Sequence, residues 1–262
     1  MVSLPFIKAS ACGNDFLLVQ LASLPPGLDV AEAARRLCDR HQGVGADGVE
    51  WLSPDPEADI RIRLINADGS PAEISGNGTR CVAAQLVSKL GKDRVVIRTD
   101  AGLRTCVLTA GSSRRFEFET AMGTPQLGNP FSIRLTYGEV SGTPVSMGNP
   151  HFVVFVEEFH PGWQTGAAEI GRHHSFPQGM NVELVKVVDR HATSVLFFER
   201  GAGETQSSGT GSCAAAVAAI GTGKAASPVE VRAAGGSQTV RWEDEVFLSS
   251  PAQLVCEGEF FL

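Results

Sequence analysis

Two short glycine-rich segments contain the residues that could do chemistry. Ser75-Gly76-Asn77-Gly78 and Ser208-Gly209-Thr210-Gly211 each place a serine at the start of a tight turn, and an apolar stretch follows each turn. A turn that opens a helix presents unpaired backbone N–H groups and the positive end of the helix dipole. Those groups can hold an anion such as a carboxylate. Glycines that only permit close packing are the alternative interpretation.

The sequence lacks the motifs that mark other kinds of site at such turns. Neither turn has the G-x-x-x-x-G-K-[ST] or G-x-G-x-x-G pattern of nucleotide sites. No G-x-S-x-G is centred on Ser75 or Ser208, which argues against a hydrolase nucleophile. A small carboxylate ligand is therefore the better hypothesis.

The two turns belong to an internal repeat. Ser75 and Ser208 differ by 133 positions, and Gly13-Asn14-Asp15-Phe16 is echoed by Gly148-Asn149-Pro150-His151-Phe152 at nearly the same offset. Asn66 and Glu199 each lie 9 residues before their serine. Three matches in one register predict two structurally similar halves.

Paired halves suit a reaction that inverts a stereocentre. One proton carrier removes a proton from one face of a carbon, and an opposed carrier returns it to the other face. The α-proton of an amino acid is a very weak acid, so the site must stabilise the carbanion through its carboxylate. Two helix N-termini could supply those hydrogen bonds without a cofactor.

The elements that would position these turns are strands and apolar helices. Leu64-Ile65 and Val195–Phe198 are β-type runs that lead into the turns. Further short β-type segments and the helices after the turns, which we expect to end at Gly91 and near Gly221, indicate an α+β protein. The additional expected strands are Phe16–Val19, Val95–Ile97, Phe152–Val156 and Val229–Val231.

Composition limits the possible partners. The chain has 262 residues, 43% of them hydrophobic, which is enough for two packed domains. A net charge of -7 without a Lys/Arg cluster argues against nucleic acid or a membrane surface. The N-terminus lacks a secretory signal, and six cysteines without a paired spacing predict buried free thiols in a reducing cytosol, with no metal site.

Six motifs in order resemble those of diaminopimelate epimerases. The resemblance covers nearly the whole chain and implies two pseudo-symmetric domains, each a β-sheet or barrel wrapped round a central helix, with the ligand in the cleft between them. The expected domains are residues 1–117 with a returning strand at 250–262, and residues 118–249. The motifs lie at residues 8–16, 40–48, 66–70, 76–81, 147–151, and 199–205 with 209–211.

Site roles follow from the resemblance. It implies that the turns bind the reacting carboxylate, and that Asn14 lies near the reacting amino group. It also implies a group that recognises the distal amino-acid end, in which Arg200 suits a carboxylate and Glu199 an ammonium. We assign no role to His151 and expect His173 and His174 to be solvated. The implied carboxylate-binding residues are Gly76, Asn77, Gly209 and Thr210, and the distal group is Asn66, Asn149, Asn181, Glu199 and Arg200.

The chain departs from the family pattern at the catalytic positions. The family places cysteines where this chain has Ser75 and Ser208. A thiol can form a thiolate base near neutral pH, whereas a serine hydroxyl is a much weaker acid. Cys81 and Cys213 lie inside the helices and are poor substitutes. The replacements are either engineered or a natural divergence, and we expect low turnover.

The implied activity is that of an isomerase. It would convert L,L-diaminopimelate to the meso form for lysine and peptidoglycan synthesis, without pyridoxal phosphate or any other cofactor, in the cytoplasm and as a possible homodimer. A catalytically inactive relative that binds an amino acid is the first alternative. A different racemase or a dehydratase on the same fold is the second.

Overall fold

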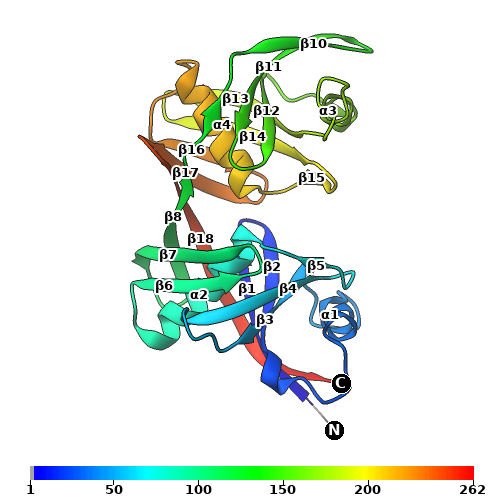
Figure 1. Cartoon of the computed structure of the whole chain (residues 1–262), viewed down its shortest axis with the longest axis vertical. Coiled ribbons are helices and arrows are strands. Elements are labelled where there is room, and N and C mark those ends of the chain that lie inside the picture. Colours follow the sequence, from blue (N-terminus) through cyan, green and yellow to red (C-terminus); the bar gives the residue numbers. More distant parts are fainter. Residues whose placement is uncertain (1–2) are drawn as a thin grey trace. The chain divides into compact units, whose positions relative to one another are not determined.

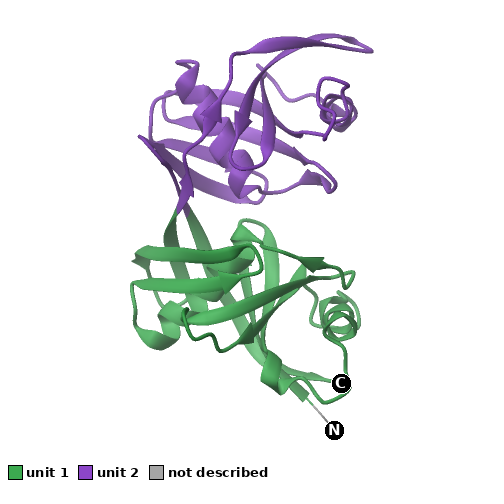
Figure 2. Ribbon diagram, viewed as in Figure 1, with its two compact units in different colours: residues 1–120, 250–262 green, residues 121–249 purple. Residues whose placement is uncertain are grey.

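The computed structural model describes residues 3–262, which divide into two compact units (Figures 1 and 2). The first unit consists of the chain up to Thr120 together with Ser250–Leu262, and the second is Ala121–Ser249. Two strands, β8 (Arg115–Gly123) and β18 (Val246–Phe261), pass the boundary between the units. Each unit has its own buried core.

The strands of the first unit form a closed ring. In order of pairing they are β1, β2, β3, β4, β6, β7, β8 and β18, and β18 pairs back with β1. The β2–β3 and β4–β6 pairs are parallel, whereas β1–β2, β3–β4 and β6–β7 are antiparallel. Their bounds are β1 (Ser3–Ala11), β2 (Asn14–Gln20), β3 (Gly48–Ser53), β4 (Ile60–Asn66), β5 (Pro71–Ala72), β6 (Arg94–Thr99) and β7 (Gly102–Gly111).

The second unit repeats this succession. Strands β11 to β17 pair as β1 to β7 do, with β12–β13 and β14–β16 again parallel. The predicted α+β class and the pseudo-symmetric halves are therefore confirmed. The bounds are β9 (Gln126–Leu127), β10 (Phe131–Leu135), β11 (Gly138–Ser146), β12 (Pro150–Phe155), β13 (Asn181–Asp189), β14 (Ala192–Glu199), β15 (Gly203–Thr205), β16 (Val229–Ala233) and β17 (Gly236–Trp242).

One long apolar helix is enclosed by strands in each unit (Figure 1). Helix α2 (Gly76–Leu90) ends at Gly91, whose φ of 66° is the left-handed conformation that favours glycine at a helix end. Helix α4 (Gly209–Gly221) is built largely from alanine, glycine and other small residues, and small side chains let the surrounding strands approach closely. Both ends agree with the sequence prediction.

Two further helices were not predicted from the sequence. Helix α1 (Val30–Cys38) and helix α3 (Trp163–Gly171) occupy equivalent places in the two units, after β2 and β12, and a 3-10 turn (η1, Leu21–Ser23) precedes α1. Asp29 caps α1 through the amides of Ala31 and Glu32. These helices pack on separate apolar clusters of their units.

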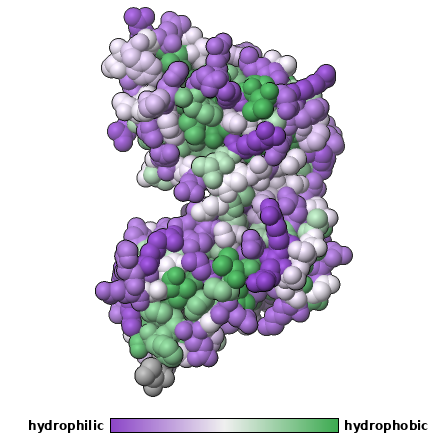
Figure 3. Space-filling model, turned by 180° about the vertical axis from the view of Figure 1, so that it is seen from behind, coloured by the Kyte–Doolittle hydropathy of each residue, from purple (hydrophilic) through white to green (hydrophobic). Residues whose placement is uncertain are grey.

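Two expectations need correction. The strand expected at Phe152–Val156 is β12 and ends at Phe155. All six cysteines are free thiols, but Cys256 is exposed rather than buried, as are its neighbours Val255 and Glu257 on β18. On the face in Figure 3, hydrophilic residues predominate and hydrophobic ones form small separate patches. No helix within residues 3–262 is long and apolar enough to span a membrane.

Candidate active site

Each unit opens its central helix with a serine cap. Ser75 Oγ accepts a hydrogen bond of 3.1 Å from the Gly78 amide, and Ser208 Oγ accepts one of 3.2 Å from the Gly211 amide. An N-cap side chain satisfies one of the first N–H groups of a helix, while the amides before it have no intrahelical acceptor. The Gly76 and Asn77 amides in α2, and the corresponding pair in α4, are suited to an anion.

In the first unit, a chain of amides fixes the turn. Asn77 Nδ2 donates to Asn14 Oδ1 at 2.7 Å, and Asn14 Nδ2 donates to Asp47 Oδ2 at 3.0 Å. Arg80, which is buried, donates to the side-chain oxygen Oδ1 of Asn77, and Arg40 forms an ion pair with Asp47. The structure therefore brings together Asn14 and Asn77, two of the residues selected from the sequence.

A buried carboxyl group lies behind the first turn. Glu50, on β3, is 0% exposed and faces α2, because it pairs with Leu18 and Leu64, which both pack in the α2 core. A Cβ added to Gly78 would overlap Oε1 of Glu50, so this carboxyl lies directly against the glycine. Burial raises the pKa of Glu50 to about 8.

The second unit has an equivalent buried carboxyl group, and this one has a hydrogen-bond partner. Glu183 Oε1 lies 2.7 Å from His151 Nδ1, and both side chains are 1% exposed. His151 Nε2 in turn contacts Asn149 Oδ1 at 3.0 Å, and Asn149 Nδ2 donates to Thr210 Oγ1 at 3.3 Å. Burial raises the pKa of Glu183, while its contact with His151 works in the opposite direction. A continuous set of contacts thus joins the second turn to a buried His–Glu pair.

The other residues selected from the sequence bond within their own units. Asn181 is buried; its Nδ2 donates to the Pro150 carbonyl and its Oδ1 accepts from the Arg200 amide, both at 2.9 Å. Arg200 is exposed, and its guanidinium donates to the Gln178 carbonyl. The remaining two contacts are Thr205 Oγ1 to Glu199 Oε1, at 2.7 Å, and Asn66 Nδ2 to Ser70 Oγ, at 3.0 Å.

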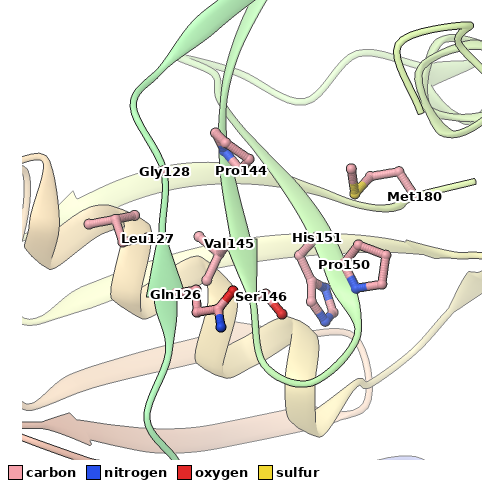
Figure 4. Close-up of a pocket in the computed structure, with 9 residues that line it drawn as sticks. All are labelled: Gln126, Leu127, Gly128, Pro144, Val145, Ser146, Pro150, His151 and Met180. Atoms are coloured by element: carbon pink, nitrogen blue, oxygen red, sulfur yellow. The ribbon is translucent and has the colours of Figure 1, made fainter. Parts of the chain in front are cut away.

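A shallow hollow of about 310 Å³ lies beside His151 in the second unit (Figure 4). Strands β9, β11 and β12 supply most of its wall, and the His151 ring forms part of it. Its polar side chains are few. The lining residues are Gln126, Leu127, Gly128, Pro144, Val145, Ser146, Pro150, His151 and Met180.

A model of one protein family, diaminopimelate epimerase, matches residues 6–127 and 143–254, which include both serine turns and both buried carboxyls. The chain belongs to the diaminopimelate epimerase family. Diaminopimelate epimerases of Pelotomaculum thermopropionicum and Moorella thermoacetica are 38% and 36% identical to it. Each alignment covers 97% of this chain and 98% of the relative. The chain is accordingly an epimerase of the isomerase class.

Solved structures with much lower identity share the fold. A Bacillus anthracis protein of the phenazine biosynthesis PhzF family superposes with a TM-score of 0.74 at 17% identity, and each chain is covered completely. A hydroxyproline epimerase from Agrobacterium vitis superposes with a TM-score of 0.68 at 16% identity, over 98% of this chain and 92% of that one. The architecture of the diaminopimelate epimerase family therefore extends to proteins with other names.

Sequence reasoning missed the buried groups of this epimerase. Glu50 and Glu183 were not selected, and His151 was given no role. A signal was present, since each glutamate lies 25 residues before its serine and so keeps the 133-residue offset of the repeat. A charged residue inside the apolar run of β3, between Val49 and Trp51, was the second signal.

Proposed function

We propose that the chain catalyses cofactor-independent epimerisation of diaminopimelate between its L,L and meso forms. Ser75 and Ser208 act as the two opposed proton carriers, and the amides at the starts of α2 and α4 hold the reacting carboxylate. Family membership and the retained turns support this assignment. The enzyme would work in the cytoplasm in lysine and peptidoglycan synthesis, as a possible homodimer.

The matched serine caps are the observation that carries the proposal. In both units the Oγ accepts from the amide three residues on, which leaves the hydroxyl proton and a second lone pair of each serine for other partners. Two equivalent carriers on two equivalent helices are what inversion of a carbon centre requires. A helix start also stabilises the negative charge that develops on the substrate carboxylate.

Serine makes the reaction slow. A hydroxyl is a far weaker acid than a thiol, so little alkoxide is available at neutral pH. We expect this chain to turn over substrate well below the rate of a form with two cysteines, while binding it normally. Retained binding with impaired proton transfer is the specific form of the proposal.

Recognition of the distal end is assigned to the second group of polar residues. Glu199 and Arg200 supply one charge of each sign, and Asn66, Asn149 and Asn181 supply amides. Replacing Arg200 by Lys keeps the charge but removes the planar fork, and should weaken diaminopimelate binding by about 1–3 kcal/mol. Calorimetry with lysine as the comparison ligand checks it, since an equal loss for lysine would remove Arg200 from the distal role.

Exchange of the α-proton in heavy water tests the proposal. The enzyme is incubated with L,L-diaminopimelate in deuterium oxide, and NMR follows deuterium at the α-carbon and the appearance of the meso form. Slow exchange with inversion is the expected result, and Ser75→Ala and Ser208→Ala should each abolish the inversion. Thr109→Val, an exposed change on β7, serves as the control.

The second candidate function is binding of diaminopimelate without catalysis. The two serines favour it, because they remove the acidic thiol from both carriers at once. An inactive relative would bind diaminopimelate by calorimetry yet incorporate no deuterium, even after prolonged incubation. A third candidate, another racemase or a dehydratase, would show exchange with a different amino acid in the same assay.

A further inference from the structure

Glu50 is a buried carboxyl without a partner. Its side chain is 0% exposed, and neither carboxyl oxygen has a hydrogen-bond partner among residues 3–262. A buried, unpaired polar group costs stability, and a charged one costs more. Hydrophobic residues surround it in the core between β3 and α2, so an apolar side chain would suit this position better. A cost of this kind is characteristic of a functional group.

The carboxyl is aimed at the start of α2. A Cβ built on Gly78 would overlap Oε1 of Glu50, and the same point lies 3.1 Å from the Glu50 carboxyl carbon and 3.3 Å from Ser75 Cβ. The carboxyl carbon and Ser75 Cβ are therefore within about 6.4 Å of each other, the sum of those two distances. A side-chain rotation or one water molecule bridges such a separation.

We propose that Glu50 is the positioning residue of Ser75, which acts as a base by passing its hydroxyl proton to the Glu50 carboxylate, directly or through one water. The inference rests on the proposed function of Ser75. Glu50 does not touch substrate, and its role is exerted through the serine. The glycine at position 78 is what allows the carboxyl to approach the turn.

The proposed proton transfer balances without an added reagent. The substrate Cα–H bond breaks, its proton bonds to Ser75 Oγ, and the electron pair remains on the carbon as a carbanion. The original Ser75 O–H bond breaks at the same time, and that proton bonds to an oxygen of Glu50. The carboxylate becomes a carboxylic acid. The reverse sequence, in which Glu50 reprotonates Ser75 while the serine protonates carbon, serves the opposite stereoisomer.

The electrostatics of the site are compatible with this exchange. Burial raises the pKa of Glu50 to about 8, so both its protonated and its ionised forms are accessible near neutral pH. The titratable neighbour on α2, Cys81, is also completely buried, and burial raises the pKa of its thiol well above the usual range. Cys81 therefore remains protonated and does not compete with Glu50.

Removing the carboxyl is the first arm of the test. Glu50→Gln and Glu50→Leu should each lower exchange of the α-proton that Ser75 serves, measured with both L,L- and meso-diaminopimelate, by at least about tenfold, while the Leu variant raises the midpoint of thermal unfolding because it removes an unpaired buried group. Thr193→Val is the matched control. Thr193 is also completely buried with a hydroxyl that lacks a partner among the described residues, but it lies on β14 beside Val187 and Val231. The control should leave exchange unchanged.

Rescue by cysteine is the second arm. A thiol ionises without help, so Glu50→Leu in a Ser75→Cys background should reduce exchange by less than about threefold. A purely structural role would produce the same loss in both backgrounds and would overturn the proposal. Full exchange by Glu50→Leu in the parent would also overturn it, and would leave the proposed function intact.

An infrared measurement decides the case in which the parent shows no exchange. Absence of exchange in the parent would contradict the proposed function but not the contact between Ser75 and Glu50. The C=O stretch of protonated Glu50, identified as the band that Glu50→Gln removes, is recorded in the parent and in Ser75→Ala at one fixed acidic pH. A shift between them supports the contact. Identical bands mean that Ser75 and Glu50 do not interact, and the inference fails.

Discussion

The two units share the same succession of strands and helices, but the equivalent buried carboxyl groups in them differ in their hydrogen-bond partners. In each unit, a glutamate on β3 or β13 lies against the last glycine of the serine turn, Gly78 or Gly211. Glu183 is paired with His151, whereas Glu50 has no partner among the described residues. The difference comes from one position, because the place of His151 at the start of β12 is taken by Phe16 at the start of β2.

This difference shows that structural symmetry does not impose chemical symmetry. Both ring nitrogens of His151 have a partner, because Nδ1 contacts Glu183 and Nε2 contacts Asn149. The first unit has a single carboxyl that gains or loses one proton. The two faces of a substrate would then meet different proton reservoirs, although the helices that present the serines are equivalent.

Restoring both thiols should have the largest effect. Each general acid–base group contributes roughly a hundredfold to ten-thousandfold, so the variant with Ser75→Cys and Ser208→Cys should exceed the parent in epimerisation by several orders of magnitude. Either single change should raise exchange but invert the centre slowly. Rates of meso-diaminopimelate formation are the measurement. A parent as fast as the double variant would mean that serine suffices.

The pH dependence of the unfolding free energy should show that Glu50 is a buried carboxyl without a partner. The pKa of Glu50 is raised by burial from 4.5 to about 8, so its contribution to stability is complete below about pH 4.5 and is lost as pH rises toward 8. The loss for such a buried group is up to about 5 kcal/mol. Urea unfolding at several pH values should show this decline in the parent but not in Glu50→Leu. Parallel curves for both proteins would refute the assigned pKa.

Removing the partnered carboxyl should have the opposite effect on stability. Glu183→Leu leaves His151 buried without its partner and should cost about 3–5 kcal/mol, whereas Glu50→Leu should stabilise. Both are measured by denaturant unfolding at one neutral pH. Changes of the same sign in the unfolding free energy of the two variants would mean that the two carboxyl groups have equivalent environments.

The serine caps should have the smallest and most symmetric effect. Ser75→Ala and Ser208→Ala each remove one acceptor for a helix amide and should cost about 1 kcal/mol in unfolding free energy. Ser→Asn at either position, which keeps an acceptor but has no acidic group, is the control and should restore stability without restoring exchange. Clearly unequal losses from the two alanine changes would break the equivalence of the turns.

The repeated turns and the helix ends could be predicted from sequence because their signals are local. Gly91 marks the end of α2, and the Ser–Gly pattern marks the starts of α2 and α4. Helices α1 and α3 were missed because their packing partners are distant strands, although Asp29 is a recognisable cap. Cys256 was expected to be buried because free cysteines usually are, and the local sequence does not show that this part of β18 is exposed.

The contacts of the two buried glutamates could also not be predicted, but the reason is different. The contact between His151 and Glu183 depends on the parallel register of β12 and β13, in which Val153 is opposite Glu183. Register is a property of the folded sheet. Likewise, the approach of Glu50 to the Gly78 turn requires α2 to lie inside the strands of its unit.

The central claim, that the units carry opposed proton carriers for one carbon, is tested most directly by which stereoisomer each serine position serves. Two variants are compared in heavy water, one with Ser75→Cys and Ser208→Ala, the other with Ser75→Ala and Ser208→Cys. Each keeps one thiol, which can remove and return a proton on one face only. We predict complementary results, in which one variant exchanges the α-hydrogen of the L centre, the other that of the D centre of meso-diaminopimelate, and neither inverts. Exchange of the same stereoisomer by both variants, or inversion by either, would contradict the account.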